Sequence, residues 1–132
     1  TGKGIKCDST YTQTEGNITL TIPSTMLSAK GIDIGKNGFL SGGSITATVS
    51  ANGSKGIKGD GNFTMSGGTM TMTCSGGKDK ITDPTDPSKC YGVKLDGTWS
   101  KTGGTCAIST TSSVAAAIKD ATKTYGADGT AE

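Results

Sequence analysis

A repeat of about 25 residues constrains the fold of this chain more than any other feature. The stretch Ser54 to Gly76, SKGIKGDGNFTMSGGTMTMTCSG, serves as the template, and imperfect copies of it occupy the rest of the sequence. An apolar residue after the first glycine marks each copy, and successive marks are 27, 25, 36 and 25 residues apart. The marks are Ile5, Ile32, Ile57, Val93 and Ile118. Such a period is typical of solenoid proteins, in which each repeat stacks on its neighbours.

Apolar and polar residues alternate within each copy, which predicts half-buried strands. A Gly-Gly pair precedes the alternating segment at 42–43, 67–68 and 103–104, where the chain must turn through angles that a side chain would obstruct. The apolar positions are Ile18, Leu20, Ile45, Ala47, Met70, Met72, Cys106 and Ile108. One repeat cannot bury its apolar row alone, so copies must stack. We therefore predict an all-β fold, a right-handed parallel β-helix (β-solenoid) of about five coils.

The repeat also predicts the domain organisation. Residues 1–132 form one domain, and because the chain opens inside a repeat we expect it to belong to a longer protein. Residues 77–89, GKDKITDPTDPSK, are an insertion with two Asp-Pro pairs and are predicted to be a surface loop. The predicted coils span about 3–29, 30–54, 55–89, 90–113 and, as a partial coil, cap or frayed end, 114–132.

Composition excludes several function classes. All 13 basic residues are lysine, and the chain has neither Arg nor His. No Ser/His/Asp relay can be built, nor a zinc site of the usual Cys/His type. The lysines alternate with acids instead of forming a basic stripe, so we expect no nucleic-acid partner. No apolar run reaches about 18 residues, so no membrane span is expected. The sequence does not predict an oligomeric state.

The four cysteines are placed by their position in the repeat. Cys74 and Cys90 flank the insertion, and a disulfide between them would staple the loop; free thiols are the alternative. Cys7 and Cys106 lie three coils apart, roughly 14 Å at the spacing of neighbouring strands, which is too far for a disulfide. We interpret these two as small buried hydrophobic residues.

Stacking would place three aspartates, Asp8, Asp60 and Asp96, in one column that Gly35 interrupts. Carboxylates from adjacent coils could share a calcium ion, which accepts six to eight oxygen ligands. They could also form the carboxylate pair of a glycosidase. The third interpretation, which we favour, is that Asp-Gly marks a tight turn in which the Asp side chain caps its own backbone.

A column of aromatic residues predicts either core or a binding platform. Tyr11, Phe63 and Trp99 occupy equivalent positions, with Gly38 in the second coil. Facing outward, the rings would stack on sugar rings; facing inward, they would be core, which the alternation around Phe63 favours. Trp99 is expected to be partly exposed because polar residues follow it.

Threonines form a further column pair on the outer side of the alternating strands. They are Thr19, Thr21, Thr46, Thr48, Thr71 and Thr73. Regular Thr-x-Thr ranks on a β-solenoid resemble those with which insect antifreeze proteins bind ice. Thr is also an ordinary strand former that tolerates water, and the rank fails at Ala107.

The combined pattern K-G-I-x-x-D-G-N-φ-x-φ-S-G-G-T-φ-T-φ-T, where φ is apolar, is clearest at 55–73 and recognisable at 30–48 and 91–109. It resembles the bacterial Cthe_2159-type family of carbohydrate-binding β-helix proteins, over most of the chain up to about residue 113. The resemblance implies a polysaccharide-lyase-like fold in a secreted or surface-anchored protein that binds cellulose or a pectic or acidic glycan, with calcium. Asp8, Asp60 and Asp96 match the family's motif acids, and Gly35 departs from it.

These observations predict a non-catalytic, extracellular polysaccharide-binding protein. Lyase chemistry on a β-helix commonly relies on a basic residue, and without Arg only a lysine such as Lys58 or Lys94 could serve. The candidate carbohydrate-binding residues are Trp99, Lys58, Lys94, Thr71 and Thr73. The alternatives are a structural rod that acts as a surface spacer and, more remotely, an ice-binding protein.

Overall fold

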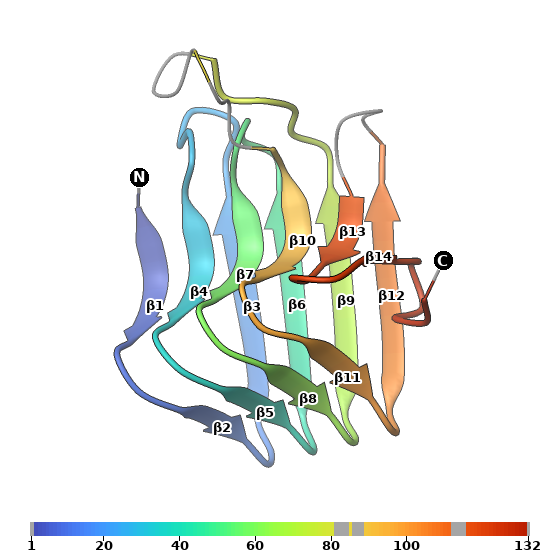
Figure 1. The fold of residues 1–132 in the computed structure, drawn as a ribbon. Helices are drawn as coiled ribbons and strands as arrows, with labels where there is room; N and C mark the ends of the chain where they lie inside the picture. The colour runs from blue at the N-terminus through green and yellow to red at the C-terminus, as the bar shows by residue number, and fades with distance from the viewer. Residues whose placement is uncertain (1, 81–84, 86–88, 112–115, 132) are drawn as a thin grey trace.

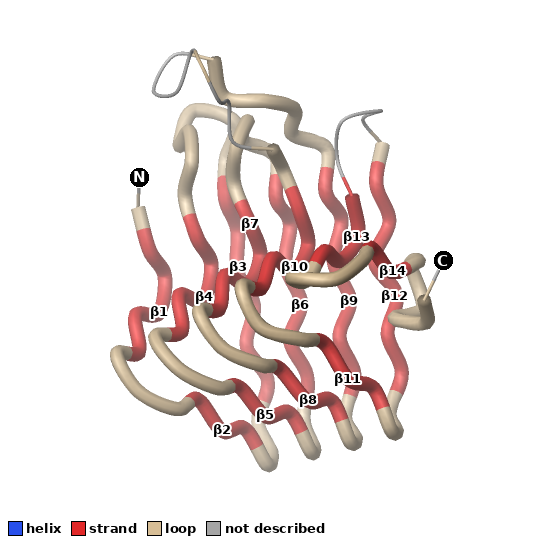
Figure 2. The backbone as a smooth tube through the Cα atoms, in the orientation of Figure 1, coloured by secondary structure: helices blue, strands red, loops and turns tan. Residues whose placement is uncertain are grey.

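The computed structural model describes residues 2–80, 85, 89–111 and 116–131, and it consists of strands joined by turns, without a helix in that part of the chain (Figures 1 and 2). The strands are β1 (Lys3–Cys7), β2 (Tyr11–Gln13), β3 (Asn17–Ile22), β4 (Lys30–Ile34), β5 (Gly38–Leu40), β6 (Ser44–Val49), β7 (Lys55–Gly59), β8 (Phe63–Met65), β9 (Thr69–Cys74), β10 (Tyr91–Leu95), β11 (Trp99–Lys101), β12 (Thr105–Thr110), β13 (Ala116–Lys119) and β14 (Thr124–Tyr125).

From β1 to β13, successive strands go to three different sheets in turn, and each sheet collects every third strand; β14 returns to the sheet of β13. Sheet A has the order β1-β4-β7-β10-β13-β14, sheet B the order β2-β5-β8-β11 and sheet C the order β3-β6-β9-β12. Neighbouring strands are parallel except for β13 and β14, which are antiparallel. Figure 1 shows the chain winding repeatedly past the three sheets. The predicted all-β fold with stacked parallel strands, a β-solenoid, is confirmed.

The predicted register is confirmed in sheets A and C. The repeat marks pair in sheet A, Ile5 with Ile32, Ile32 with Ile57, Ile57 with Val93 and Val93 with Ile118. In sheet C the pairs are Ile18 with Ile45, Ile45 with Met70, and Met70 with Cys106. A slip of one residue would move every apolar side chain to the outer face, so burial of the inner face fixes this pairing.

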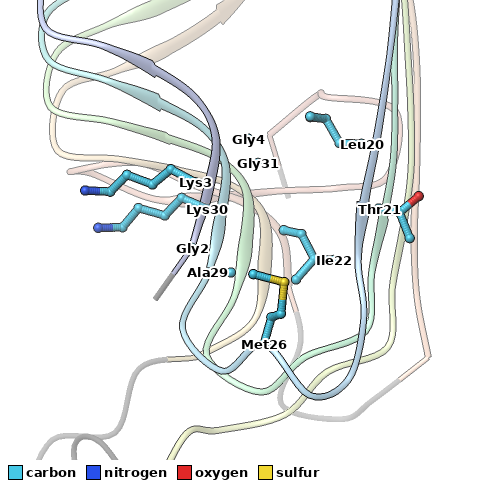
Figure 3. A pocket seen from close by; sticks show the side chains of 10 residues that line it. All are labelled: Gly2, Lys3, Gly4, Leu20, Thr21, Ile22, Met26, Ala29, Lys30 and Gly31. Carbon is cyan, nitrogen blue, oxygen red and sulfur yellow. The ribbon is translucent and has the colours of Figure 1, made fainter.

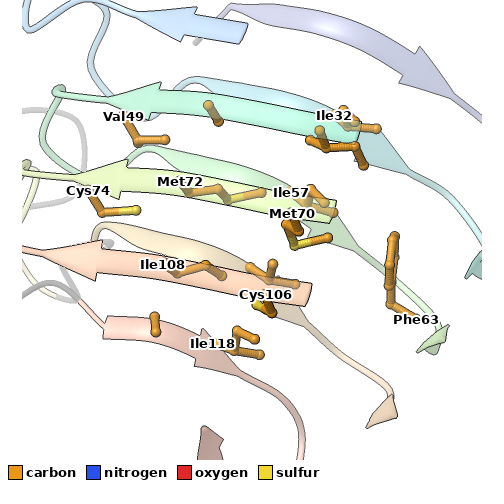
Figure 4. Packing of buried hydrophobic residues seen from close by; sticks show 14 of the residues in the cluster. Ile32, Val49, Ile57, Phe63, Met70, Met72, Cys74, Cys106, Ile108 and Ile118 are labelled. Atoms are coloured by element: carbon orange, nitrogen blue, oxygen red, sulfur yellow. The ribbon is translucent and has the colours of Figure 1, made fainter. Parts of the chain in front are cut away.

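The core is a narrow column of apolar side chains enclosed by the three sheets (Figure 4). The glycine of each K-G-I segment lets sheet A approach sheet C closely. A Cβ on Gly56 would lie 2.7 Å from the sulfur of Met72 and 2.7 Å from the carbonyl oxygen of Gly92. The second glycine of each Gly-Gly pair has a positive φ, 75° at Gly43 and 74° at Gly68, which explains why glycine stands there.

The C-terminal segment caps one end of the solenoid. β14 folds back on β13, and the backbone N–H of Ile108 in the last strand of sheet C donates to the carbonyl oxygen of Ala127. In the described part of 114–132, β13 continues sheet A as a partial coil parallel to β10, and the residues after it fold back over the end of the solenoid as a cap. The predicted boundary between 113 and 114 lies outside the described residues, as do positions 81–84 and 86–88 of the predicted insertion loop.

The other end is open. β1, β2 and β3 each lie at the end of their sheet, and the inward side chains of Ile5 and Tyr11 are only half-buried. Cys7 is also only half-buried, whereas the sequence predicted it to be buried, because no strand in the described part of the chain pairs with the outer edge of β1. Cys106 is buried as predicted.

Candidate functional site

The outer side of sheet A carries two rows of lysines that run along the solenoid. In the first row the pairing places Lys3 next to Lys30 and Lys30 next to Lys55. The second row is Lys6, Asp33, Lys58, Lys94 and Lys119. We call the seven lysines of these rows the lysine face. Neighbouring strands are about 4.8 Å apart, so the first row stacks three lysines on adjacent strands.

Ion pairs with aspartates neutralise most of the second row. Lys58 donates to Asp60 at 3.1 Å and to Asp96 at 3.0 Å. Partial burial lowers the pKa of Lys58, but these hydrogen bonds outweigh it and hold the pKa above its ordinary value. Partial burial likewise raises the pKa of Asp96, and the hydrogen bond and charge of Lys58 outweigh it and lower that pKa. The remaining contacts are Lys6 with Asp8 at 2.6 Å, Lys6 with Asp33 at 4.0 Å, and Lys94 with Asp96 at 3.6 Å.

The first row is less neutralised. Lys3 pairs with Asp33 at 3.3 Å, whereas Lys30 and Lys55 have no ion pair with any residue that the structure describes. Lys55 donates to the carbonyl oxygen of Gly53 at 2.9 Å. Burial, followed by the charge of Lys30, lowers the pKa of Lys55 to about 8. The centre of the lysine face is therefore a cationic site without a carboxylate partner.

The predicted aspartate column is present, but the contacts of its carboxylates differ from the expectation. The backbone N–H of Asp60 donates to Ile34 and that of Asp96 donates to Gly59, which stacks the two turns. Asp60 and Asp96 lie in bends between strands, as the turn interpretation predicted, but their carboxylates bond lysines and do not cap their own turns. The asparagine two residues after Asp60 bonds the next coil, because the side-chain oxygen of Asn62 accepts from the N–H of Thr98 at 2.9 Å.

The aspartate column does not fit a calcium ion in this arrangement. The ammonium group of Lys58 bridges Asp60 and Asp96, the place that a cation shared between adjacent coils would take. In the described part of the chain, no three Cys, Asp or Glu side chains gather closely enough to hold a metal ion. Calcium binding by Asp8, Asp60 and Asp96 stays a prediction of the sequence that would require displacement of lysine.

The expectation that Trp99 is partly exposed is wrong. Its side chain is 4 % exposed, because the C-terminal cap covers it, and its ring stacks on Phe63. The indole N–H donates to the carbonyl oxygen of Gly129 at 2.9 Å. Phe63 in turn fills the space above Gly38, where a Cβ would lie 2.4 Å from the ring. The aromatic column is core, so Trp99 offers no platform for sugar rings in this structure.

The threonines form a regular outer surface on sheet C, which we call the threonine face. Thr71 and Thr73 are exposed and pair with Thr46 and Thr48 on one side. On the other side they pair with Ala107 and Ser109. Sequence reasoning missed a third rank of small polar residues on the same face, two positions earlier in each strand. This rank is Asn17, Ser44, Thr69 and Thr105.

A cavity of about 280 Å³ lies at the open end of the solenoid (Figure 3). Leu20 and Ile22 of β3 line it, together with Met26 and Ala29, and Lys3 and Lys30 extend away from it. Its wall is largely apolar, and a sugar needs several polar groups for orientation, so the cavity does not suit a glycan.

The four cysteines, all in the described part of the chain, are free thiols. Cys74 and Cys90 are both buried, and their thiols are close enough to shift each other's pKa. The structure has no covalent bond between them, and the disulfide stays a prediction.

Sequence reasoning also missed Lys30 and Lys55. The signal was present, because lysine precedes the first glycine in three copies of the repeat, at Lys3, Lys30 and Lys55. What sets these two lysines apart is the distribution of ion pairs, because aspartates pair with Lys3, Lys6, Lys58 and Lys94 but, among the described residues, not with Lys30 or Lys55.

Comparison with known proteins gives no relative. No family model, no curated protein and no solved structure matches this chain. The resemblance to carbohydrate-binding β-helix proteins thus stays a prediction. Among the described residues, no helix is long and apolar enough to cross a membrane.

Proposed function

We propose that this protein is a non-catalytic binding protein for acidic polysaccharide, and that the polymer lies across the lysine face. The observation that carries the proposal is the stack of Lys30 and Lys55, which have no carboxylate partner in the described part of the chain and of which Lys55 has its pKa lowered to about 8. Neighbouring ammonium groups repel each other, and a polymer with a carboxylate on successive sugars would relieve that repulsion at each strand.

The architecture supports a polymeric ligand over a small one. The lysine rows follow the solenoid axis at the spacing of neighbouring strands, about 4.8 Å. A repeating ligand can thus contact equivalent groups on β1, β4 and β7.

We also infer that the chain is a right-handed helix of about five coils, the last being the cap, since crossovers between parallel strands of one sheet are right-handed in nearly all proteins.

The environment of the candidate catalytic lysines supports a binding role. Lys58 and Lys94 contact carboxylates, and the pKa of Lys58 is raised, which is the opposite of what a general base at neutral pH requires. These two lysines fit better as charged hydrogen-bond donors at the border of the site. Acidic polysaccharides are found outside cells, so the proposal includes a secreted or cell-surface location.

Thr71 and Thr73 lie on sheet C and not on the lysine face. A polymer bound across sheet A would not need them. Binding of a neutral, ordered surface such as cellulose or ice through the threonine face is a separate proposal with a separate test.

Affinity electrophoresis tests the proposed function. The protein is run through gels with polygalacturonate or with neutral hydroxyethyl cellulose, and the K30Q/K55Q variant is compared with K36Q/K80Q, in which two exposed lysines outside the lysine face lose the same charge. We expect polygalacturonate to retard the native protein and the control variant but not K30Q/K55Q. Equal loss in both variants would indicate unspecific charge attraction. Parallel gels with calcium and with a chelator test the calcium prediction.

The second candidate function is a spacer rod. The observation that favours it is the open end, where the free edges of β1, β2 and β3 could pair with further strands. Absence of retardation in every gel would favour this function over polysaccharide binding.

A further inference from the structure

The three strands at the open end of the solenoid differ in how well their free edges are protected against pairing (Figure 1). β1 carries Lys3 and Lys6, and charged side chains on an edge strand oppose pairing with another chain. β2 has only three residues. β3, Asn17–Ile22, has six residues, carries no charge and no proline, and pairs with β6 without a break. Of the three edges, that of β3 is therefore the one best suited to accept a further strand.

Hydrogen bonds to β6 show which backbone groups of β3 face the open edge. The N–H of Ser44 donates to the carbonyl oxygen of Gly16, and the N–H of Ser50 donates to that of Ile22. A parallel neighbour bonds every second residue of a strand, so the even-numbered residues of β3 face β6. The residues whose N–H and C=O groups point to the open edge are Asn17, Thr19 and Thr21. In a single copy, water must satisfy this row of donors and acceptors.

The inward side chains of β3 are less buried than their counterparts in the next coil. Ile18 and Leu20 are half-buried, whereas the residues that pair with them on β6, Ile45 and Ala47, are 0 % and 2 % exposed. Leu20 also lines the apolar cavity at this end. A further strand beside β3 would cover both side chains, and burial of their apolar surface would favour its pairing.

We propose that β3 pairs with β3 of a second copy of this chain, antiparallel and about a two-fold axis at Thr19. The proline that follows β3 has no N–H, so the favoured register keeps it outside the ladder. In that register Thr19 lies opposite its own equivalent, and Asn17 of each copy lies opposite Thr21 of the other. The edge groups then bond each other. On the inner face, Ile18 of each copy lies opposite Leu20 of the other, so apolar side chains meet.

The two-fold axis also keeps like charges apart. β1 lies over the C-terminal half of β3, where a Cβ on Gly4 would be 3.2 Å from the side chain of Leu20. β2 lies over the N-terminal half, where the side-chain amide of Gln13 donates to the carbonyl oxygen of Gly16 at 3.0 Å. Because the axis reverses the direction of β3, β1 of each copy lies towards β2 of the other. The lysines of β1 thus meet a strand whose three side chains are uncharged and bear oxygen atoms that accept hydrogen bonds.

A second copy fits this edge better than an open-ended stack of copies does. The opposite end of the solenoid is closed, because β14 runs antiparallel to β13 and the N–H of Ile108 bonds the carbonyl oxygen of Ala127. Among the described strands, each copy thus offers one long uncharged free edge, and pairing of identical edges about a two-fold axis closes on itself. The product is a dimer in which sheet C continues from one copy into the other and the two threonine faces join.

Sedimentation equilibrium of the native chain and of lysine variants tests the proposal. T19K places like charges opposite each other at the axis, and T71K makes the same change at the equivalent exposed position of the third coil. We expect a dimer for the native chain and for T71K, and a dissociation constant raised about tenfold or more for T19K. An equimolar mixture of T19K and T19E should dimerise again, because the facing charges are then opposite.

Amide hydrogen exchange gives a second readout of the same contact. The amides of Thr19 and Thr21 should exchange more slowly as the concentration of native protein rises, and should stay fast in T19K. An equal effect of T19K and T71K on dimerisation, or assembly beyond a dimer, would overturn the proposal. A native monomer at millimolar concentration would also overturn it, and would favour a further coil of a longer chain as the occupant of this edge. These measurements need no polysaccharide, so their failure is distinct from failure of the proposed function.

Discussion

The ring of Trp99 stacks on the ring of Phe63, with centroids 5.7 Å apart and planes 11° apart. Phe63 belongs to β8 and Trp99 to β11, so the stack continues the core into the fourth coil. Tyr125 of the cap follows at 6.5 Å from Trp99. The aromatic column therefore connects the regular coils to the C-terminal cap, and it is a structural feature, not a binding surface.

Removal of the Trp99 side chain should destabilise the protein strongly. We expect W99A to lower the free energy of unfolding by about 3–5 kcal/mol, because the ring is buried and a cavity would remain. W99F keeps a ring on Phe63 and loses the hydrogen bond to Gly129, so its cost should be about 1–2 kcal/mol. Urea unfolding measures both values. Equal, small effects would contradict the buried stack.

The fluorescence of Trp99 should not report polysaccharide binding. The ring is covered by the cap and lies away from the lysine face, so emission should keep its wavelength when polygalacturonate is added. A shift of emission on binding would place the ligand near the cap and would contradict the proposed site.

Asp120 should hold the cap in place. Its carboxylate is buried and accepts hydrogen bonds from the N–H of Trp99 at 2.9 Å and the hydroxyl of Tyr125 at 2.6 Å. Burial raises the pKa of Asp120, but these bonds, with those from Thr122 and Lys123, outweigh it and hold the pKa far below its ordinary value. We expect D120N to cost about 2–4 kcal/mol at pH 7.

The sign of the pH dependence follows from that lowered pKa. The contribution of Asp120 is complete above the ordinary carboxyl pKa of 3.8 and is lost as the pH falls towards the pKa of the folded state. The difference in stability between native protein and D120N should thus shrink below about pH 4. The exposed Glu15 serves as control, since E15Q should change stability by under about 0.5 kcal/mol. A difference that stays constant down to pH 2 would contradict the assignment.

Polysaccharide binding should weaken as the pH rises through about 8, the pKa of Lys55. Loss of the proton removes one ammonium from the lysine face, and we expect the affinity to fall about two- to fivefold between pH 7 and pH 9. K55Q should bind more weakly at pH 7 and lack this step. Titration calorimetry at three pH values checks both, and the same step in K55Q would assign it to another group.

The threonine face should be independent of the acidic ligand. Thr71 and Thr73 are exposed on sheet C, so T71A/T73A should leave the affinity for polygalacturonate unchanged. The same variant tests ice binding, because ice shaping and thermal hysteresis, if the native protein has them, should be lost. Weaker polygalacturonate binding in T71A/T73A would show that the ligand extends over sheet C.

The repeat made much of the fold predictable. The alternation predicted half-buried strands, of which the one around Ile18 and Leu20 is β3, and the repeat marks predicted the pairing of sheet A because one buried face permits one register. The cap was not predictable in the same way. Residues 120–129 have no counterpart in the repeat, so nothing in the pattern indicated that Asp120 and Gly129 would cover Trp99.

The candidate site was predicted only in part. The Asp60 and Asp96 column followed from the register, but its partner did not, because the reach of the Lys58 side chain to both acids depends on side-chain conformation. The importance of Lys30 and Lys55 depends in the same way on the distance of the nearest acids. A repeat predicts which residues stack on one another, whereas the ion pairs that neutralise the stacked charges become visible only in the three-dimensional structure.

A backbone amide NMR titration with a short oligogalacturonide tests the central claim most directly. The account predicts shifts that concentrate on β4 and β7 around Lys30 and Lys55, decrease towards β10, and leave sheet C and the cap unchanged. Shifts that concentrate on the threonine face or around Trp99, or no shift at ligand concentrations up to the millimolar range, would contradict the assignment of the lysine face as a polysaccharide-binding surface.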